Sequence, residues 1–285
     1  MKKVQKVVAG AVALLSGLGF MACDGEKNVM VISREAGSGT RSAFEEIVKK
    51  DGVKLQDATL LDEVEIVSTT GAVISKVETN KTAIGYVSFS SVSDSVKTLK
   101  INGVEATADN VQNGSYPIKR PFLLLTSTQY ALSPVAQDFY NYCMSVESKD
   151  EIEREGCIET NREEFTYTTT AASITGTVKL EGSTSMTDIM TALIGEYKKV
   201  QPNVTVEATY NGSSNGRSAV QKDTSGNTIG LASASKADAA YVEHTLCLDA
   251  IAVIVNKACV VENIRVEALF DIYTGTITKF SAISD

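Results

Sequence analysis

Histidine is almost absent from this chain, whose 285 residues include a single one, His244. Histidine supplies many metal sites and the general base of most nucleophilic triads, so neither chemistry has enough residues to build on. The cysteines beyond position 23 follow no metal-ligand spacing, and we expect buried thiols rather than disulfides. These cysteines are Cys143, Cys157, Cys247 and Cys259. The composition therefore disfavours a metalloenzyme or a serine hydrolase and predicts no metal.

Nucleotide-binding motifs are missing as well. No Gly-rich loop ends in Gly-Lys-Ser/Thr, and no GxGxxG occurs. Basic residues are also outnumbered by acidic ones, 27 against 35, which gives a formal net charge of −8. Such a field repels nucleic acid and anionic membrane surfaces, so we expect no nucleic-acid partner. An anionic ligand would have to be held by local donors against this field.

The first 23 residues have the pattern of an export signal. Lysines near the start precede an apolar run at 7–20 that is too short for a membrane-spanning helix, and Ala22-Cys23 follows. The small residue before Cys23 resembles a bacterial lipobox, although the two residues before Ala22 differ from the preferred ones. We expect residues 1–23 to be a lipoprotein signal peptide. Lipidated Cys23 would anchor the mature protein outside the cytoplasmic membrane; a simple cleaved signal is the alternative.

Strand, turn and helix patterns alternate along the rest of the chain, in which 43% of all residues are hydrophobic and 22% are charged. The predicted strands cover residues 29–33, 64–67, 83–87, 122–125, 178–180, 204–210, 229–232 and 248–255. The predicted helices cover residues 41–50, 71–78, 133–155 and 186–200, with another ending near 220. This alternation predicts an α/β fold with mixed sheets flanked by helices, in which ligands bind beyond the strand C-termini.

Two of the predicted turns share one design, at residues 37–40 (Gly-Ser-Gly-Thr) and 182–185 (Gly-Ser-Thr-Ser). In each, a strand ends, small residues allow close backbone approach, hydroxyls follow and a helix begins. Unpaired amides of a helix N-terminus and nearby hydroxyls would then point at one spot, which suits an oxyanion. Ordinary helix capping explains either turn alone. Two such turns, with Arg34 just before the first, favour anion binding.

Several segments together resemble the PstS-type periplasmic phosphate-binding proteins, over nearly everything between Val29 and Phe280. They are 33–41 (SREAGSGTR), 71–73 (GAV), 83–87 (AIGYV), 182–185 (GSTS), 212–216 (GSSNG), 229–233 (IGLAS), 248–253 (LDAIAV) and 270–275 (FDIYTG). The resemblance implies a two-lobed type II periplasmic-binding-protein fold that closes by hinge motion. It also implies a non-enzymatic protein without a cofactor, which delivers inorganic phosphate to the permease of an ABC importer.

The order of these segments differs from the order in that family, where the segment like 182–185 opens the mature protein and the segment like 33–40 lies in its middle. We therefore expect a circularly permuted fold, with residues 160–176 as the linker joining the usual termini. In this arrangement residues 28–115 form the smaller lobe and residues 116–285 the larger lobe. A natural rearrangement, part of a tandem duplication and an engineered origin all remain open.

The resemblance also implies the site residues. Phosphate contacts are assigned to Arg34, Ser38, Gly39, Thr40, Thr184, Ser185, Ser233 and Asp249, with Glu35 orienting Arg34. A carboxylate at Asp249 can only accept hydrogen bonds. It therefore favours binding of an anion that still carries a proton, as phosphate does and sulfate does not at neutral pH. There are three alternatives to this function. The protein could bind another tetrahedral oxyanion, it could be a surface sensor or adhesin that keeps the fold, or, third, it could be a phosphohydrolase.

Overall fold

The computed structural model of the chain describes residues 27–158, 160, 165–168 and 174–283. The predicted signal peptide with Cys23, and part of the predicted linker at 160–176, lie outside the described residues. Within the described ranges, no helix is both long enough and apolar enough to cross a membrane.

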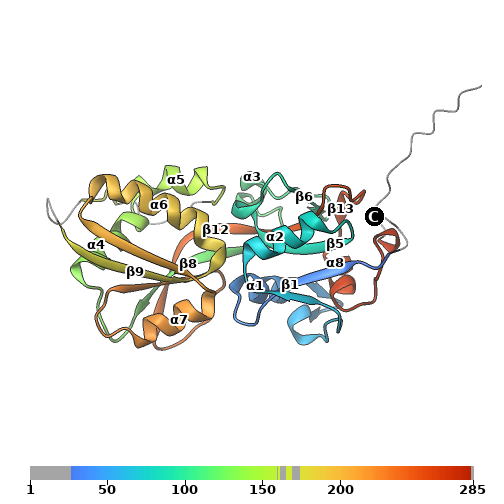
Figure 1. The fold of residues 1–285 in the computed structure, drawn as a ribbon, viewed down its shortest axis with the longest axis horizontal. Coiled ribbons are helices and arrows are strands. Elements are labelled where there is room, and N and C mark those ends of the chain that lie inside the picture. Colours follow the sequence, from blue (N-terminus) through green and yellow to red (C-terminus); the bar gives the residue numbers. More distant parts are fainter. Residues whose placement is uncertain (1–26, 159, 161–164, 169–173, 284–285) are drawn as a thin grey trace, which may run out of the picture.

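One nine-stranded mixed sheet runs through both lobes of the molecule, in the order β10-β9-β11-β8-β12-β5-β1-β4, with β6 also paired to β12. These strands are β10 (Val204–Tyr210), β9 (Gly176–Gly182), β11 (Thr228–Ala232), β8 (Lys119–Ser127), β12 (Tyr241–Asn256), β5 (Ala83–Ser88), β1 (Met30–Arg34), β4 (Glu65–Val67) and β6 (Val96–Thr98). Strands β9, β10 and β11 are parallel, as are β1, β4 and β5. Strands β8 and β12 are antiparallel to each other and cross between the lobes (Figure 1).

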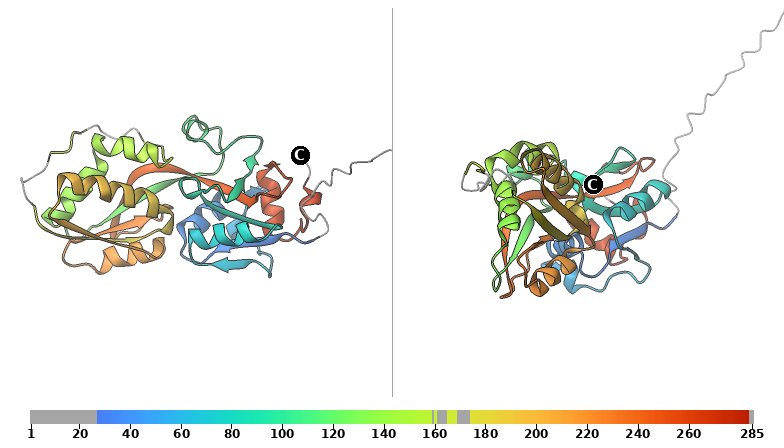
Figure 2. Two further views of the ribbon diagram at one scale, coloured as in Figure 1. Left: turned by 45° about the horizontal axis from the view of Figure 1, so that its top comes forward. Right: turned by 60° about the vertical axis from the view of Figure 1, so that its left-hand side comes forward.

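Short strand pairs and helices complete the two lobes (Figure 2). The strand pairs are β2 (Lys49–Lys50) with β3 (Val53–Lys54), and β7 (Lys100–Ile101) with β13 (Asn263–Ile264). The helices are α1 (Gly39–Ile47), α2 (Thr70–Thr79), α3 (Ala108–Gln112), α4 (Pro134–Met144), α5 (Lys149–Arg154), α6 (Thr187–Val200), α7 (Ser213–Lys222) and α8 (Val266–Tyr273). The predicted fold class, α/β with mixed sheets flanked by helices, is confirmed.

The period-two alternation of side chains places helices on both faces of the sheet. On β8, Phe122 and Leu124 join the core built with α4 and α6, while Leu123 and Leu125 join the core built with α7. Strand β12 alternates in the same way, because Ile251 packs with α1 and α8 while the next residue packs with α2. A strand that is covered on both faces has an unbroken run of apolar residues in its sequence, as residues 250–255 do.

The hydrophobic cores divide the chain differently from the predicted boundary at residue 115. The cores of the first lobe combine residues 29–118 with residues 250–280 and also include Ile158 and Ala234, and those of the second lobe lie within 122–247. The reason is the length of β12, which begins in the second lobe and ends beside β5 in the first. The chain therefore crosses between lobes twice, near residues 120 and 249, and residues 250–283 belong with the first lobe.

The predicted helix at 133–155 is also wrong in its extent, because it consists of two helices. Helix α4 ends at Met144, and Ser145 is extended, with φ −87° and ψ 171°. The hydroxyls of Ser145 and Ser148 donate to backbone carbonyls just upstream, which offers the chain an alternative to continuing the helix. The predicted burial of the cysteines is confirmed for all four.

Candidate anion-binding site

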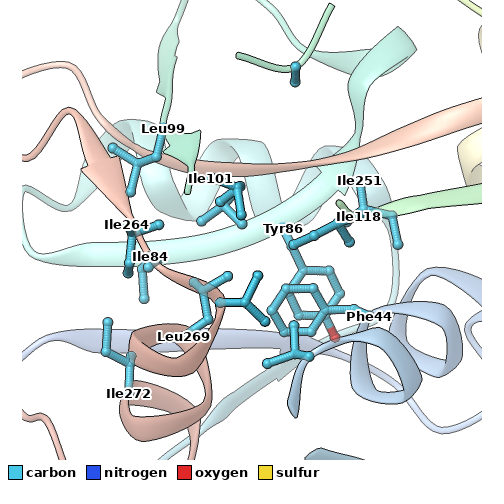
Figure 3. Packing of buried hydrophobic residues seen from close by; sticks show 14 of the residues in the cluster. Phe44, Ile84, Tyr86, Leu99, Ile101, Ile118, Ile251, Ile264, Leu269 and Ile272 are labelled. Atoms are coloured by element: carbon cyan, nitrogen blue, oxygen red, sulfur yellow. The ribbon is translucent and has the colours of Figure 1, made fainter. Parts of the chain in front are cut away.

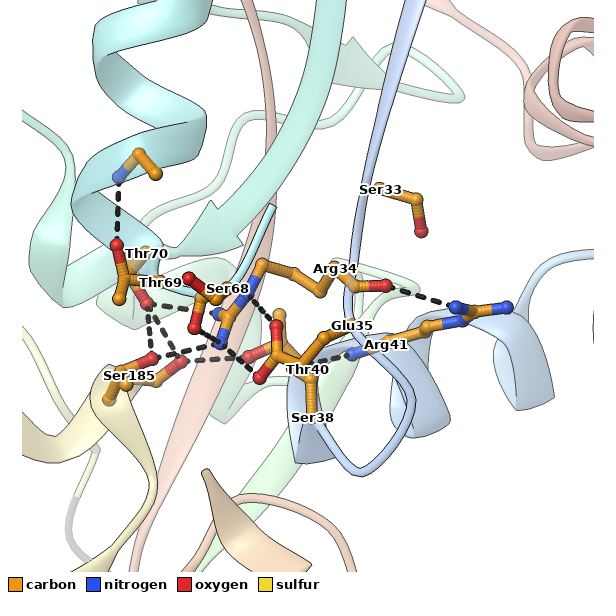
Figure 4. A network of polar contacts seen from close by, with 12 residues as sticks. Ser33, Arg34, Glu35, Ser38, Thr40, Arg41, Ser68, Thr69, Thr70 and Ser185 are labelled. Carbon is orange, nitrogen blue, oxygen red and sulfur yellow. Dashed lines mark hydrogen bonds and ion pairs between the residues drawn. The ribbon is translucent and has the colours of Figure 1, made fainter. Parts of the chain in front are cut away.

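The two hydroxyl-rich turns meet where the lobes face each other, although they are about half the chain apart in sequence. Thr40 at the start of α1 lies 2.7 Å from Ser185, measured between their hydroxyl oxygens. Arg34 at the end of β1 donates from Nη2 to the Thr184 hydroxyl at 3.0 Å. Figure 4 shows the first-lobe residues around this contact with Ser185. The structure thus brings together residues that the resemblance assigned to one ligand.

Arg34 is held in place by a carboxylate on the next residue. Its Nε donates to Glu35 Oε2 at 2.9 Å and its Nη2 to Oε1 at 3.0 Å, so the pair is bidentate. The Arg34 side chain is 2% exposed, whereas that of Glu35 is 27% exposed. Arg34 also donates to the hydroxyl of Thr70 and to the carbonyl of Ser68. The guanidinium is therefore oriented on one edge and contacts both lobes on the other.

A stack of aromatic rings in the first-lobe core supports this end of β1 (Figure 3). The rings of Phe44 and Tyr86 lie 4.0 Å apart and nearly parallel, and Tyr273 packs against both. The Tyr86 hydroxyl lies 2.7 Å from Ser33 Oγ and accepts the amide of Arg34. Burial raises the pKa of Tyr86 to about 12, so the phenol stays protonated. The core thereby fixes the backbone from which the arginine projects.

Gly39 is required by the close approach of the two lobes. A Cβ at this position would lie 2.5 Å from the hydroxyl oxygens of Ser213 and Ser233, which belong to the second lobe. Nearby, the amide of Ser214 donates to the carbonyl of Gly37. Gly37 itself has φ +95°, a conformation that favours glycine. Because these contacts join the two lobes, the lobes are in a closed arrangement.

Four helices of eight or more residues begin at or just after this cluster. Helices α1 and α2 begin at Gly39 and Thr70, α7 begins at Ser213, and α6 follows a single 3₁₀ turn at 184–186. Their N-terminal amides give the cluster a positive potential without a net charge. Ser38 takes the ordinary capping role, because its hydroxyl accepts the amide of Arg41. The cluster as a whole is a set of donors suited to an oxyanion.

The second lobe contributes a linked group of serines. The Ser183 hydroxyl donates to Ser233 Oγ at 2.8 Å, and Ser213 Oγ accepts the amide of Ser233. All three are buried. Ser233 was assigned to the site from the resemblance, whereas Ser183 and Ser213 were noted only as parts of motifs. Their positions follow from β9, β10 and β11 being parallel, since parallel strands end at the same edge of a sheet.

Thr70 is a site residue that the sequence analysis missed. Its hydroxyl lies 3.2 Å from that of Thr184 and 3.4 Å from that of Ser185, and it accepts from Arg34. A signal was available, because Ser68-Thr69-Thr70-Gly71 is a third hydroxyl-rich turn between a strand and a helix. Only its glycine was used in the resemblance.

Arg120 is a second residue that the sequence analysis missed. It precedes the apolar part of β8, and its side chain is 1% exposed. Its Nη1 donates to Thr40 Oγ1 at 2.7 Å and to the carbonyl of Ser233 at 3.3 Å. The aromatic ring of Phe122 lies 5.2 Å from the guanidinium carbon. A second buried guanidinium thus adjoins the hydroxyl cluster.

Asp249 has a different partner from the one expected. Its Oδ2 accepts from Arg120 Nε at 3.1 Å, and the two residues are opposite each other in the β8–β12 register. Burial raises the pKa of Asp249, and Arg120, the Ser88 hydroxyl and the Ser90 backbone oppose that rise. Burial likewise lowers the pKa of Arg120, and Asp249 opposes it. In the described part of the chain, Arg120 Nη2 and Asp249 Oδ1 are buried atoms without a hydrogen-bond partner.

A polar pocket of about 420 Å³ opens beside the cluster, along the seam between α1 and α7. Its walls include Gly37 and Ser42 from the first lobe and Ser214, Arg217 and Lys236 from the second. The lining also includes Asp238, so two cationic side chains and one carboxylate face this pocket. Among the described residues, no group of three or more His, Cys, Asp or Glu is arranged to hold a metal ion.

Two α/β lobes joined by a pair of crossing strands, with donors from both lobes meeting between them, define a periplasmic-binding-protein architecture. The family model described as a PBP superfamily domain matches residues 24–147 and 168–283. Phosphate-binding protein PstS 2 of Streptococcus pneumoniae is 36% identical over 99% of both chains, and its namesake in Streptococcus agalactiae is 34% identical over 100% of both. The chain belongs to the PstS-type family of this superfamily.

A solved structure agrees with this assignment. The crystal structure of a phosphate-binding protein of a phosphate ABC transporter from Streptococcus pneumoniae is 36% identical, with a TM-score of 0.67, and the match covers 90% of this chain and 100% of that one. The family predicted from the sequence is thus confirmed. The streptococcal relatives align along the whole chain, so they share its segment order. A permutation relative to other PstS-type proteins stays a prediction.

Proposed function

We propose that this protein is an extracytoplasmic solute-binding protein that captures inorganic phosphate and delivers it to the permease of an ABC importer. The observation that carries the proposal is the meeting of donors from both lobes at one buried cluster, centred on Arg34, Thr40, Thr184 and Ser185. Its relatives at 34–36% identity are named phosphate-binding proteins. A tetrahedral anion suits donors that converge from several directions.

The proposed phosphate contacts follow the chemistry of each group. Arg34 supplies a charge-assisted donor whose far edge is fixed by Glu35. The hydroxyls of Thr40 and Ser185 contact each other across the lobes, the Thr184 hydroxyl accepts from Arg34, and all three would turn to the ligand oxygens. The backbone around Gly39 and Ser38 adds amides of a helix N-terminus. Ser233 adds a further second-lobe hydroxyl.

Binding and release would accompany a hinge motion. The closed arrangement depends on cross-lobe bonds, among them Arg34 to Thr184 and Ser91 to Asp188, and the second of these lies away from the hydroxyl cluster. Opening would separate both pairs and give the ligand access. Substrate-binding proteins of ABC transporters are not enzymes, and the proposed role includes no catalytic step.

The proposed cellular position is the outer face of the cytoplasmic membrane, through a lipid on Cys23 after removal of the signal peptide. The support is the sequence pattern at residues 1–23. Metabolic labelling with a fatty acid, compared between the wild type and Cys23→Ala, tests it. Label in the wild type and none in the variant is the expected result, and equal labelling would contradict it.

Calorimetric titration of the mature protein with phosphate and then with sulfate tests the ligand. We expect a one-site phosphate isotherm and no heat from sulfate at the same concentration. If the protein prefers sulfate or another tetrahedral oxyanion, the proposed ligand is wrong, but the protein is still an anion-binding solute-binding protein. No anion binding at all would favour a sensor or adhesin that keeps the fold.

A further inference from the structure

Arg120 carries donors that have no partner in the part of the chain that the structure describes. A guanidinium has five N–H groups. In Arg120 the Nε group binds Asp249, and Nη1 contacts Thr40 and the carbonyl of Ser233. Its Nη2 has no partner among the described residues, although the side chain is 1% exposed. Buried donors of this kind are rare in folded proteins because they lose their water without replacement.

The position of this unused donor connects it to the hydroxyl cluster. Arg120 Nη1 lies 2.7 Å from Thr40 Oγ1, and the same oxygen lies 2.7 Å from Ser185 Oγ. Nη2 is bonded to the same carbon as Nη1 and Nε, so one of its N–H groups lies on the edge that meets these hydroxyls and the other on the edge that faces Asp249. On its other edge, Arg120 is fixed by Asp249 and packs beside Phe122. The side chain is therefore pre-positioned, as Arg34 is by Glu35.

We infer that Arg120 is a second guanidinium that binds the phosphate directly through Nη2, and that Asp249 is the residue that positions it. This inference rests on the proposed function. It assigns the two arginines to different parts of the anion, with Arg34 next to Thr184 and Arg120 next to Thr40. It also changes the role expected for Asp249 from a direct contact with the ligand to an anchor for Arg120.

The test replaces both members of the pair, because removing Arg120 alone leaves a buried unpaired carboxylate. The double variant Arg120→Gln/Asp249→Asn keeps neutral hydrogen-bonding groups of similar size. Its matched control is Lys50→Gln/Asp271→Asn, which removes a cation–carboxylate pair of 2.7 Å in the first lobe, outside the hydroxyl cluster. Calorimetry with inorganic phosphate gives the Kd of each protein, and circular dichroism establishes that each is folded.

We expect the double variant to bind phosphate at least about tenfold more weakly than the wild type, since a charge-assisted hydrogen bond is lost. The control pair should bind within about twofold of the wild type. A folded double variant with the wild-type Kd would overturn the inference while leaving the proposed function intact. Absence of phosphate binding by the wild type would overturn the proposed function itself.

If the double variant does not fold, a single variant of Arg120 still tests whether this residue binds phosphate. Arg120→Lys retains the charge and the pairing with Asp249, but a single ammonium cannot bind the carboxylate and reach both Thr40 and the ligand. We expect a loss of about threefold to tenfold in phosphate affinity. An unchanged Kd in this folded variant would also overturn the inference.

Discussion

The site contains two arginine–carboxylate pairs that share their chemistry and differ in how they are built. Arg34 and Glu35 are neighbours in sequence, and Glu35 is 27% exposed. Arg120 and Asp249 are 129 residues apart, and both side chains are almost fully buried. The first pair can be recognised within one motif. The second exists only because β8 and β12 pair in a register that sets the two residues opposite each other.

This difference predicts different energetic roles. Removal of Arg34 leaves Glu35, which is 27% exposed and can be solvated by water, so the cost in stability should be small, about 0–1 kcal/mol. A buried pair that loses one member leaves a charge without solvent, at a cost of about 3–5 kcal/mol. We therefore expect the Arg34 pair to affect the ligand and the Arg120 pair to affect both the ligand and the fold.

The largest effect should come from Arg34→Ala. Phosphate affinity should fall about a thousandfold, because charge-assisted hydrogen bonds from a pre-oriented guanidinium are lost. The fold should be kept, since Glu35 can be hydrated. Calorimetry measures the affinity, and Lys199→Ala, at an exposed ion pair of the second lobe, is the control. Near-wild-type affinity in the Arg34 variant would remove this residue from the site.

Arg120→Gln should be the most destabilising of these substitutions, with a loss of about 3 kcal/mol in unfolding free energy at neutral pH. Burial already raises the pKa of Asp249, and this substitution removes the opposing effect of Arg120. The folded state then binds more protons than the unfolded state above the ordinary Asp pKa of about 4. The loss should therefore be smallest at or below that pH and should grow as pH rises.

Urea denaturation at several pH values measures this dependence. Adding Asp249→Asn to the Arg120 variant should restore most of the stability at neutral pH and remove the pH dependence that the carboxylate causes. If the single and double variants were equally unstable at every pH, an uncompensated carboxylate would not be the cause.

Gly39→Ala should weaken the contacts of both arginines with the ligand by keeping the lobes apart. The added methyl would lie 2.5 Å from the hydroxyls of Ser213 and Ser233 in the closed arrangement. We expect about a tenfold loss of phosphate affinity, through a smaller population of the closed form. Solution scattering should show less compaction with phosphate than in the wild type. Gly71→Ala, where a Cβ would meet nothing within 4 Å, is the matched control.

The smallest effect should come from Glu35→Gln. Arg34 keeps its bonds to Thr70 and Thr184 and loses only the charge of its orienting partner. Phosphate affinity should change by about threefold and stability by less than about 1 kcal/mol. A large loss of stability would show that the two arginine pairs are not as different as their exposure indicates.

The sequence was informative wherever a residue and its role share one segment. Arg34, Gly39 and Thr40 follow one another through a strand end and a helix start, so their convergence could be argued from the turn alone. The same reasoning could have found Thr70 at the third turn of this kind. Periodicity also predicted the α/β alternation, because each strand carries apolar residues in a local pattern.

Features that depend on sheet register could not be predicted. The assignment of residues 250–283 to the larger lobe was wrong because nothing local shows that β12 leaves one lobe and ends in the other. Asp249 was identified as important, yet its partner lies on another strand, and only the pairing of β8 with β12 sets Arg120 against it. The end of helix α4 at Met144 was also not predicted. The serine hydroxyls that bond to nearby carbonyls there do not change the hydrophobic periodicity from which helices were predicted.

The pairing of β8 with β12 has a consequence for how the chain can change over evolutionary time. Most surface loops tolerate an inserted residue, because the strands around them keep their faces. An insertion between Lys119 and Pro121 would instead shift β8 by one position and turn Arg120 to the opposite face of the sheet. The connection between the lobes would survive and the second guanidinium would be lost. If Arg120 binds the ligand as inferred, the length of this crossing is constrained by ligand binding as well as by folding.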